Sequence, residues 1–269
     1  MWLNHVTQVD VPAGRFWMDL CAGRDQVAMH VHQKGWASYE APLPWLLARW
    51  CERLSPFVVD VGSNTGFYSL LAAVSGAKHV MAIEPVQEIA DVLAANVRLS
   101  ELNAQVQLLR VALGDHVGEQ VLHFPLADHG LLETSASLNP NFRAQHSQQR
   151  SVPVQTLDAA LSDHLQLAGS VPLLVKMDVE SLELAVLAGG DKVMTQWRPA
   201  VVAEILPGAN VAAWQQFMQR WGYVHFALQI EAPYVSTQPT DIQPDMAVRD
   251  HLFLPKADVQ RWFGTEKSQ

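Results

Sequence analysis

Acidic side chains stand near the ends of two apolar segments of the sequence. The segment 172–180 (PLLVKMDVE) ends with Asp178 and Glu180, and the segment 199–205 (PAVVAEI) carries Glu204 near its end. A carboxylate beside a hydroxyl can accept its proton, and a positioned base of this kind typically accelerates a reaction ~10²–10⁴-fold. An unpaired buried carboxylate is otherwise costly, which favours a site role for Glu204. We take Asp178, Glu180 and Glu204 as candidate catalytic residues.

A purely structural role also explains part of this pattern. Glu180 and Glu183 would fall in the first turn of a helix, where the helix dipole favours an acid by ~0.3–1 kcal/mol. Asp178 would serve equally well as the N-cap of that helix. The sequence therefore leaves open which carboxylate accepts a proton, and whether it does so directly or through a metal.

A glycine-containing turn between a strand and a helix indicates a ligand site. Residues 57–73 (FVVDVGSNTGFYSLLAA) read as a buried strand to Asp60, a turn, and an apolar helix. The dinucleotide fingerprint needs glycine at three positions, for the turn, the pyrophosphate and the helix packing. Counting from Gly62, the second and third positions hold Asn64 and Phe67. The turn also lacks the Gly-Lys-Ser/Thr of a P-loop, so it argues against a bound pyrophosphate.

S-adenosyl-L-methionine suits this turn better than a dinucleotide does. It has no phosphate, and its ammonium and sulfonium groups are attracted to a carboxylate such as Asp60. Gly62 and Gly66 give the turn the backbone freedom that it needs. Glu84 ends the second strand, 22 residues after Gly62, where an acid can accept the ribose hydroxyl protons, and Pro85 then turns the chain away. We predict S-adenosyl-L-methionine as the cofactor.

These residues need strands that end at one edge of a sheet. Leu43, Leu46, Leu47, Trp50, Cys51 and Leu54 recur with helical spacing and predict an amphipathic helix before the first strand. Strands alternating with helices then predict a parallel sheet covered on both faces, an α/β fold. The expected strands are 57–60, 79–85, 106–115, 172–180 and 199–205, with 118–126 as a further extended segment and 223–230 and 247–255 as a late, hairpin-like pair.

Two regions have no such regular pattern. We expect residues 1–36 to be an N-terminal extension of short strands and turns, and residues 37–269 to form one domain. The histidines of the HVH sequence (30–32) would lie on one strand face, and two such residues without a third are more typical of a surface than of a metal site. The segment 127–150 is polar and without period, which fits a substrate lid or a disordered loop equally well. Tryptophans such as Trp214 and Trp221 lie on an apolar helical stripe and are expected in the core.

The composition excludes several classes of partner. The formal net charge is −9 and no run of Lys or Arg occurs, so we expect neither nucleic acid nor an anionic membrane surface as a partner. The N-terminus lacks the pattern of a signal peptide, and no apolar run reaches the ~20 residues of a membrane helix. Two cysteines, Cys21 and Cys51, are too few for a disulfide framework and fit a reducing compartment. We expect a cytoplasmic protein.

Five segments, in this order, resemble the FkbM family of class I S-adenosylmethionine-dependent methyltransferases: VVDVGSNTGFYSLLAA, AIEP, VALGD, VQTLD and VKMDVESLELAVLAGG. The resemblance covers roughly residues 37–255. It implies a Rossmann-like, mostly parallel seven-stranded sheet with an antiparallel last strand, and O-methylation of sugar or polyketide hydroxyls. One departure is Ser181, where the family more often has glycine, so the turn beside Glu180 is expected to differ.

The resemblance also implies roles for individual residues in binding the cofactor. The turn would hold the methionine part, Glu84 with Pro85 would hold the ribose, and Ala112 and Asp115 would flank the adenine. The turn residues concerned are Asp60, Gly62, Ser63, Asn64, Gly66 and Phe67.

The expected reaction is methyl transfer from S-adenosyl-L-methionine to a hydroxyl of a small acceptor, a sugar or glycan. Such an in-line displacement depends on alignment, which can lower a barrier by roughly 7–11 kcal/mol. A divalent metal is possible but not predicted, and the oligomeric state is left open. The alternatives are a nicotinamide-dependent oxidoreductase on a similar fold, and a non-catalytic module that keeps the cofactor pocket.

Overall fold

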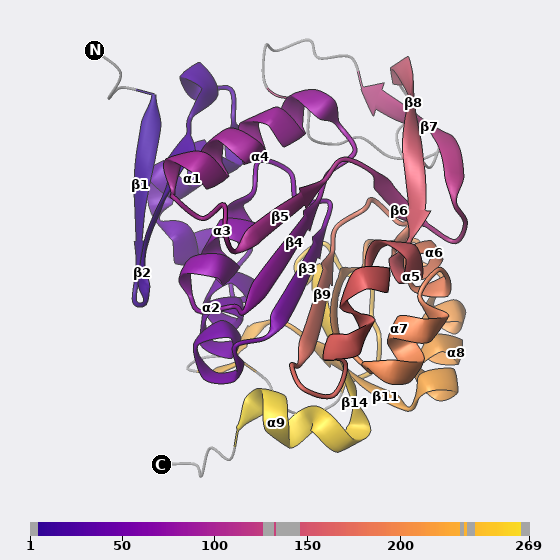
Figure 1. Ribbon diagram of the computed structural model, residues 1–269. Coiled ribbons are helices and arrows are strands. Elements are labelled where there is room, and N and C mark those ends of the chain that lie inside the picture. The colour runs from indigo at the N-terminus through magenta and orange to yellow at the C-terminus, as the bar shows by residue number, and fades with distance from the viewer. Residues whose placement is uncertain (1–4, 126–131, 133–145, 232–233, 236–239, 265–269) are drawn as a thin grey trace.

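The computed structural model describes residues 5–125, 132, 146–231, 234–235 and 240–264. A seven-stranded sheet runs through the middle of the molecule with helices on either side (Figure 1). Its strands are β3 (Phe57–Val61), β4 (His79–Ile83), β5 (Val106–Leu109), β9 (Leu173–Met177), β10 (Ala200–Glu204), β11 (Tyr223–Ala227) and β14 (Asp250–Pro255).

The strand order is β11-β14-β10-β9-β3-β4-β5. Neighbours from β10 to β5 pair in parallel, whereas β14 is antiparallel to both β10 and β11. The last strand of the chain in this sheet, β14, therefore lies antiparallel between β10 and β11. This arrangement confirms the predicted class I methyltransferase fold. Because the other strands run the same way, their carboxyl ends meet at one edge, and β14 begins at that edge.

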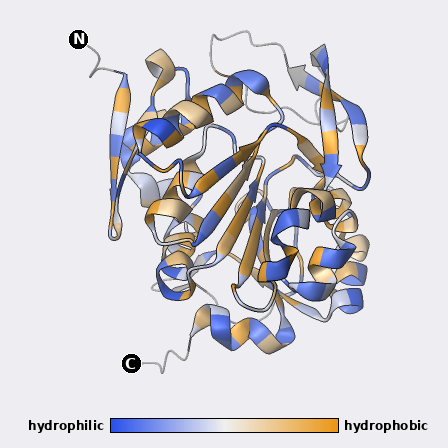
Figure 2. Ribbon diagram, viewed as in Figure 1, coloured by the Kyte–Doolittle hydropathy of each residue, from blue (hydrophilic) through white to orange (hydrophobic). Residues whose placement is uncertain are grey.

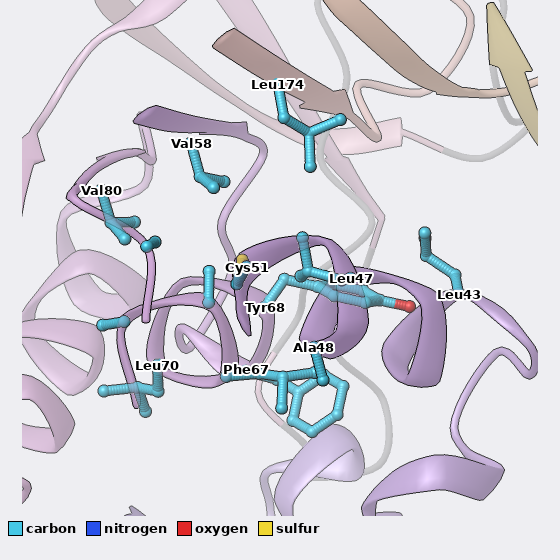
Figure 3. Packing of buried hydrophobic residues seen from close by; sticks show 14 of the residues in the cluster. Leu43, Leu47, Ala48, Cys51, Val58, Phe67, Tyr68, Leu70, Val80 and Leu174 are labelled. Carbon is cyan, nitrogen blue, oxygen red and sulfur yellow. The ribbon is translucent and has the colours of Figure 1, made fainter. Parts of the chain in front are cut away.

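Helices cover both faces of this sheet because apolar residues fill its strands and alternate between the two sides. Val58, Val80 and Leu174 pack against α2 (Leu43–Leu54) and α3 (Phe67–Val74), as Figure 3 shows. Val59, Met81 and Val175 belong to the core of the other face. The helices of these two layers also include α4 (Gln87–Leu99), α6 (Glu183–Ala188), α7 (Asp191–Gln196), α8 (Val211–Trp221) and α9 (Val259–Phe263). Figure 2 shows apolar colour concentrated on the central strands.

Most predicted elements are found close to their predicted bounds. The amphipathic helix is α2, and the late pair is β11 with β14. Trp214 is buried on α8 as expected, with Phe217 beside it, whereas Trp221 is only half-buried. Short elements complete the described chain: β12 (Ile230–Glu231), β13 (Tyr234–Val235), and the 3₁₀ turns Cys21–Gly23, Trp36–Ser38, Ser162–Leu167 and Lys256–Asp258.

The N-terminal region differs from its prediction in one element. β1 (Val6–Val11) and β2 (Gly14–Asp19) form the expected short strands, but the next segment is a helix, α1 (Gln26–Lys34). Asp25 caps it, because its side chain accepts from the amide of Ala28 at 3.0 Å. The prediction of a strand face for HVH is wrong, since residues two apart on a helix point about 200° apart.

The predicted third strand, 106–115, is also wrong in its second half. β5 ends at Leu109, and residues Ala112–Gly114 form β6, which leaves the main sheet. β6 pairs in parallel with β8 (His146–Thr156), whose other edge pairs with β7 (Gly118–Pro125). An apolar run does not show which strand it pairs with, so the sequence could not separate β5 from β6.

The segment 127–150 lies largely outside the described residues, so the predicted lid stays a prediction. Its last five residues, 146–150, begin β8 rather than a loop. The VQTLD motif that follows is structural. Thr156 caps α5 (Leu157–Ala160), and the carboxylate of Asp158 accepts from the amides of Lys192 and Val193 at the start of α7.

Candidate active site

A cavity of about 690 Å³ lies at the edge where β3, β4, β9 and β10 end. One wall is apolar and the opposite one is acidic. We call Val86, Ile89, Val111, Ala112, Leu113 and Leu122 the apolar end, and Glu40, Asp178, Glu180 and Glu204 the acidic end. Between them the wall contains Gly62, Asn64, Glu84 and Pro85, and α1 adds Gln26 and His30.

The turn after β3 is fixed by backbone bonds to its two neighbouring strands. The amides of Gly62 and Ser63 both donate to the carbonyl of Ile83 at 3.0 Å, and the amide of Asp178 donates to Val61 at 3.0 Å. Gly62 has a φ of +75°, and a Cβ there would overlap the carbonyl oxygen of Asp178. Only glycine lets the ends of β3 and β9 approach this closely.

Four residues in and around the β3 turn that were predicted to bind the cofactor do not line the cavity. Ser63 joins the turn to β4: its hydroxyl donates to the carbonyl of Asp60 and accepts from the amide of Ile83, both at 2.7 Å. Gly66 starts α3 with a φ of +100° and lies against Leu93. Phe67 is buried in the core. These residues build the turn rather than the cavity wall.

Asp60, the fourth, is fully buried beneath the turn. Its Oδ2 accepts from the Ser69 hydroxyl at 2.6 Å, and its Oδ1 lies 3.9 Å from Nζ of Lys176. Burial raises the pKa of Asp60, and the ammonium of Lys176 opposes that rise. Asp60 therefore supports Lys176 and the turn, and a direct contact with a ligand stays a prediction.

Glu84 lies in the cavity wall in a fixed orientation. Its Oε2 accepts from the amide of Asn64 at 3.0 Å, and its Oε1 from the amide of Val86 at 2.9 Å. Burial raises the pKa of Glu84 to about 7, although both amide bonds act in the opposite direction. Two carboxylate oxygens offer about four acceptor sites, so two remain for a ligand. This geometry suits a pair of ribose hydroxyls.

The two residues predicted to flank adenine are separated by the structure. Ala112 lies in the apolar end of the cavity. Asp115 does not line the cavity: its side chain is 60% exposed and pairs with Nδ1 of His116 at 2.7 Å, which lowers the pKa of Asp115. The apolar end also includes Ile89 from α4 and Leu122 from β7, which the sequence analysis had not assigned to the site.

The acidic end brings together the three predicted catalytic residues. Asp178 follows β9 and its Oδ2 lies 3.7 Å from Nζ of Lys176. Glu204 ends β10 and its Oε1 lies 2.9 Å from Nη1 of Arg249. Burial raises the pKa of Glu204 to about 7, Asp178 adds to the rise, and Arg249 opposes it. A carboxyl group with this pKa is suited to accept a proton near neutral pH.

The turn after Asp178 is held by a neighbouring acid. Glu180 and Ser181 both have positive φ, +56° and +75°. Oε1 of Glu183 accepts from the amides of Val179 and Ser181 at 3.3 Å, so Glu183 has a structural role here. Ser181 thus adopts the left-handed conformation that glycine adopts easily. The expected difference from the family in this turn stays a prediction.

Two charged residues of the cavity wall, Arg249 and Glu40, were not identified by the sequence analysis. Arg249 precedes β14, and its Nη2 also lies 3.3 Å from Oε1 of Glu40, which stands before α2. The other oxygen of Glu40 accepts from the hydroxyl of Tyr68 at 2.8 Å. The antiparallel last strand was a usable signal, because such a strand begins where its parallel neighbours end. It would have placed Arg249 beside Glu204.

Within the described residues, no group of three His, Cys, Asp or Glu side chains is placed to hold a metal ion. In the same part of the chain, no helix has the length and apolar character needed to span a membrane.

The sequence of this chain matches the protein-family model of the methyltransferase FkbM domain over residues 60–224. The comparison with curated proteins gives no match.

Solved structures with a similar fold are distant in sequence. The FkbM methyltransferase of Methylobacillus flagellatus KT is 15% identical, with a TM-score of 0.46 over 74% of this chain and 43% of its own. This chain thus spans less than half of that relative. An S-adenosylmethionine-dependent methyltransferase of Agrobacterium tumefaciens is 11% identical. The match has a TM-score of 0.48 and covers 95% of this chain and 71% of that protein. An O-methyltransferase of Bacillus cereus, in complex with S-adenosylhomocysteine, is 10% identical. The match has a TM-score of 0.44 and covers 79% of this chain and 80% of that protein.

The family model covers more than half of the chain and includes the β3 turn, Glu84 and the acidic residues after β9 and β10. This chain belongs to the FkbM family of S-adenosylmethionine-dependent methyltransferases.

Proposed function

We propose that the protein transfers the methyl group of S-adenosyl-L-methionine to a hydroxyl of a small acceptor, a sugar or glycan. The observation that carries the proposal is Glu204, a carboxylate in the cavity wall whose pKa is raised to about 7. An alcohol must lose its proton as it attacks, whereas a more acidic nucleophile would not need such a base. We further propose that the reaction takes place in the cytoplasm, as the cysteine content indicates.

The donor would lie across the strand ends in one orientation. Its ribose would bind Glu84, its adenine would contact Ala112 and the apolar end, and its methionine part would lie over Gly62 and Asn64. This arrangement directs the methyl group toward Asp178 and Glu204. The bound cofactor supplies an activated methyl carbon, and the protein aligns the acceptor with it.

Charge supports a cationic donor over a dinucleotide. The carboxylates of the acidic end outnumber the one Lys or Arg that lines the cavity within the described chain, Arg249. A sulfonium is stabilised by such an excess, whereas a pyrophosphate would be repelled. The carboxylate of Glu84 also accepts a hydrogen bond from the backbone amide of Asn64. A turn that binds phosphate would direct such an amide at its ligand instead.

Proton transfer would use residues already placed for it. Glu204 accepts the hydroxyl proton, while Arg249 holds the carboxylate in position at 2.9 Å. Asp178, closer to the turn and to Lys176, contributes negative charge near the sulfonium. In this assignment, Glu204 is the base and Asp178 a stabiliser of the donor.

The test is a product screen by mass spectrometry. The protein is incubated with S-adenosyl-L-methionine and a panel of free and glycosidic sugars, and each acceptor is examined for the mass gain of one methyl group. We expect a product whose methyl is attached to oxygen, as fragmentation or NMR would show. Methyl transfer only to nitrogen, carbon or sulfur acceptors would overturn the proposal, as would calorimetry that shows binding of NAD but not of S-adenosyl-L-methionine.

A further inference from the structure

The acidic end carries more negative charge than its cations balance. Four carboxylates face the cavity there, and Asp60 and Asp250 lie behind them. Asp250 stands opposite Glu204 in the β10–β14 pairing. Among the described residues, the printed ion pairs of this end share two cations: Lys176 lies near Asp60 and Asp178, and Arg249 near Glu40 and Glu204, so four carboxyl groups stand against two cations. A bound group with positive charge would reduce this excess.

Both cations are already engaged. Arg249 contacts Glu204 through Nη1 at 2.9 Å and Glu40 through Nη2 at 3.3 Å. Lys176 is buried, and its Nζ lies between Asp60 and Asp178 and 4.7 Å from the centre of the Tyr68 ring. An anionic acceptor would have to draw one of them away and leave a carboxylate without its partner. Such a step is costly in a partly buried site.

The methyl donor supplies only part of the missing positive charge. Its ammonium, sulfonium and carboxylate give it a net charge of about +1 near neutral pH, judged from ordinary pKa values. An aromatic residue lies beside the acidic end, because Tyr39, which precedes Glu40 in the chain, also lines the cavity. A carboxylate beside an aromatic ring is a combination that attracts an ammonium group, through ion pairing and a cation–π contact.

We propose that the acceptor carries an amine as well as the hydroxyl that is methylated, as an amino sugar does, and that its ammonium group binds at Glu40 and Tyr39. The hydroxyl would then face Glu204. This inference rests on the proposed function and specifies its acceptor.

The amine would also favour the reaction itself. Nearby positive charge lowers the pKa of a carboxylate, so a bound ammonium group would shift Glu204 toward its ionised form. The base would then be ready when the correct acceptor is bound. A neutral sugar would leave Glu204 partly protonated near neutral pH, because its pKa is about 7.

Calorimetric titration with simple glycosides tests the inference, whichever acceptor the protein meets in the cell. The protein, saturated with S-adenosylhomocysteine, is titrated with three matched probes: the methyl glycosides of glucosamine, glucose and glucuronic acid. We expect the glucosaminide to bind at least tenfold more tightly than the glucoside, and the glucuronide to bind more weakly still. In Glu40→Gln the preference for the amine should fall to less than threefold.

Glu52→Gln is the matched control, because Glu52 is an exposed acid on α2 that does not line the cavity. It should keep the full preference. Equal affinities, tighter binding of the glucuronide, no binding of any probe, or an unchanged preference in Glu40→Gln would each overturn the inference. Methylation of a neutral sugar hydroxyl without an amine preference would do so too, while leaving the proposed function intact.

Discussion

The carbonyl oxygen of Asp178 occupies the space where a side chain on Gly62 would begin. The contact joins the ends of β3 and β9, so the turn after β3 and the start of the acidic end are positioned together. Gly62→Ala would force the two strand ends apart and also place alanine at a φ of +75°. We expect a loss of ~2–4 kcal/mol in the free energy of unfolding, the range of overpacking together with left-handed strain.

Gly169→Ala is the control for this substitution. Gly169 has a φ of +84° but no atom within 4 Å of the added Cβ, so it tests the backbone strain alone. Chemical denaturation should show a loss of ~1–2 kcal/mol there, with donor affinity unchanged. A Gly62→Ala variant no less stable than Gly169→Ala, and equally able to bind the donor, would contradict the role given to this contact.

The sequence predicts the sheet well because its signals are local. Apolar runs, a glycine turn and acids at strand ends are all visible within a few residues, and Glu84 and Glu204 were located in this way. The resemblance added the position of the antiparallel strand. What the sequence could not show is which side of an element faces the cavity. Asp60, Ser63 and Phe67 were therefore assigned to the cofactor, although none of them lines the cavity.

Contacts between distant segments explain the residues that were missed. Nη2 of Arg249 lies 3.3 Å from Oε1 of Glu40, although the two residues are far apart in the chain. Neither residue lies in a recognisable motif. Asp115 illustrates the converse case, because it belongs to a recognisable motif but does not line the cavity and pairs with His116. The helix α1 had readable signals, an N-cap at Asp25 and a glycine at its C-terminus, which could have corrected its assignment.

Ser181 offers a test of backbone strain beside the acidic end. Its φ of +75° lies in the left-handed region, which costs a non-glycine residue about 1 kcal/mol. Ser181→Gly should relieve this strain and raise the free energy of unfolding by ~0.5–1 kcal/mol, which corresponds to a rise in Tm of about 1–4 °C. The control is Ser162→Gly, at an exposed serine that is not among the positive-φ residues, where Tm should fall. Equal effects at both serines would refute the strain argument.

Donor binding should depend on the ionisation of Glu84. The pKa of Glu84 is about 7 in the ligand-free protein, and only the carboxylate can accept from both ribose hydroxyls. We expect the Kd of S-adenosyl-L-methionine to fall roughly tenfold between pH 6 and pH 8, since ionisation rises from about 10% to about 90%. Calorimetry on Glu84→Gln should show weaker binding and a flat pH profile; a profile as steep as that of the wild type would exclude Glu84 as its source.

The stability of the ligand-free protein should fall as the pH rises above 6.5. Burial raises the pKa of Asp250 to about 8 and those of Glu84 and Glu204 to about 7, so the folded state binds protons that the unfolded state has released. The stabilising effect of these protons is complete below the unfolded pKa values near 4, and it is lost as the pH rises through 7 and 8. The buried pair His225 and His251 has lowered pKa values, so it titrates below this window.

Thermal melts from pH 6.5 to pH 8.5 measure this loss. We expect Tm to decrease by ~2–4 °C for each kcal/mol of stability lost. Asp250→Asn should reduce the slope, because it removes the group with the highest of these carboxyl pKa values, while the exposed Asp163→Asn should not change it. A wild-type Tm that is constant or rises over the range would show that these carboxyl groups are ionised in the folded protein at lower pH.

The pairing of Glu204 with Arg249 makes a prediction about the reaction rate. Glu204→Gln should reduce kcat ~10²–10⁴-fold, because the amide cannot accept the hydroxyl proton. The Kd of S-adenosyl-L-methionine should change less than threefold, since the proposed arrangement places the donor mainly at Glu84 and the turn. A variant with near-wild-type kcat would remove Glu204 from the mechanism and leave Asp178 as the candidate base, which Asp178→Asn would then test.

Arg249→Met separates the role of the cation from that of the base. Nη1 of Arg249 lies 2.9 Å from Oε1 of Glu204, and this cation opposes the rise in the pKa of Glu204 that burial and Asp178 cause. Loss of the guanidinium would therefore raise that pKa further. In a pH profile of kcat/KM, the acidic limb should therefore move from near pH 7 to higher pH, and Arg249→Lys should move it less. A reduced rate with an unmoved limb would mean that Arg249 acts on the acceptor rather than on Glu204.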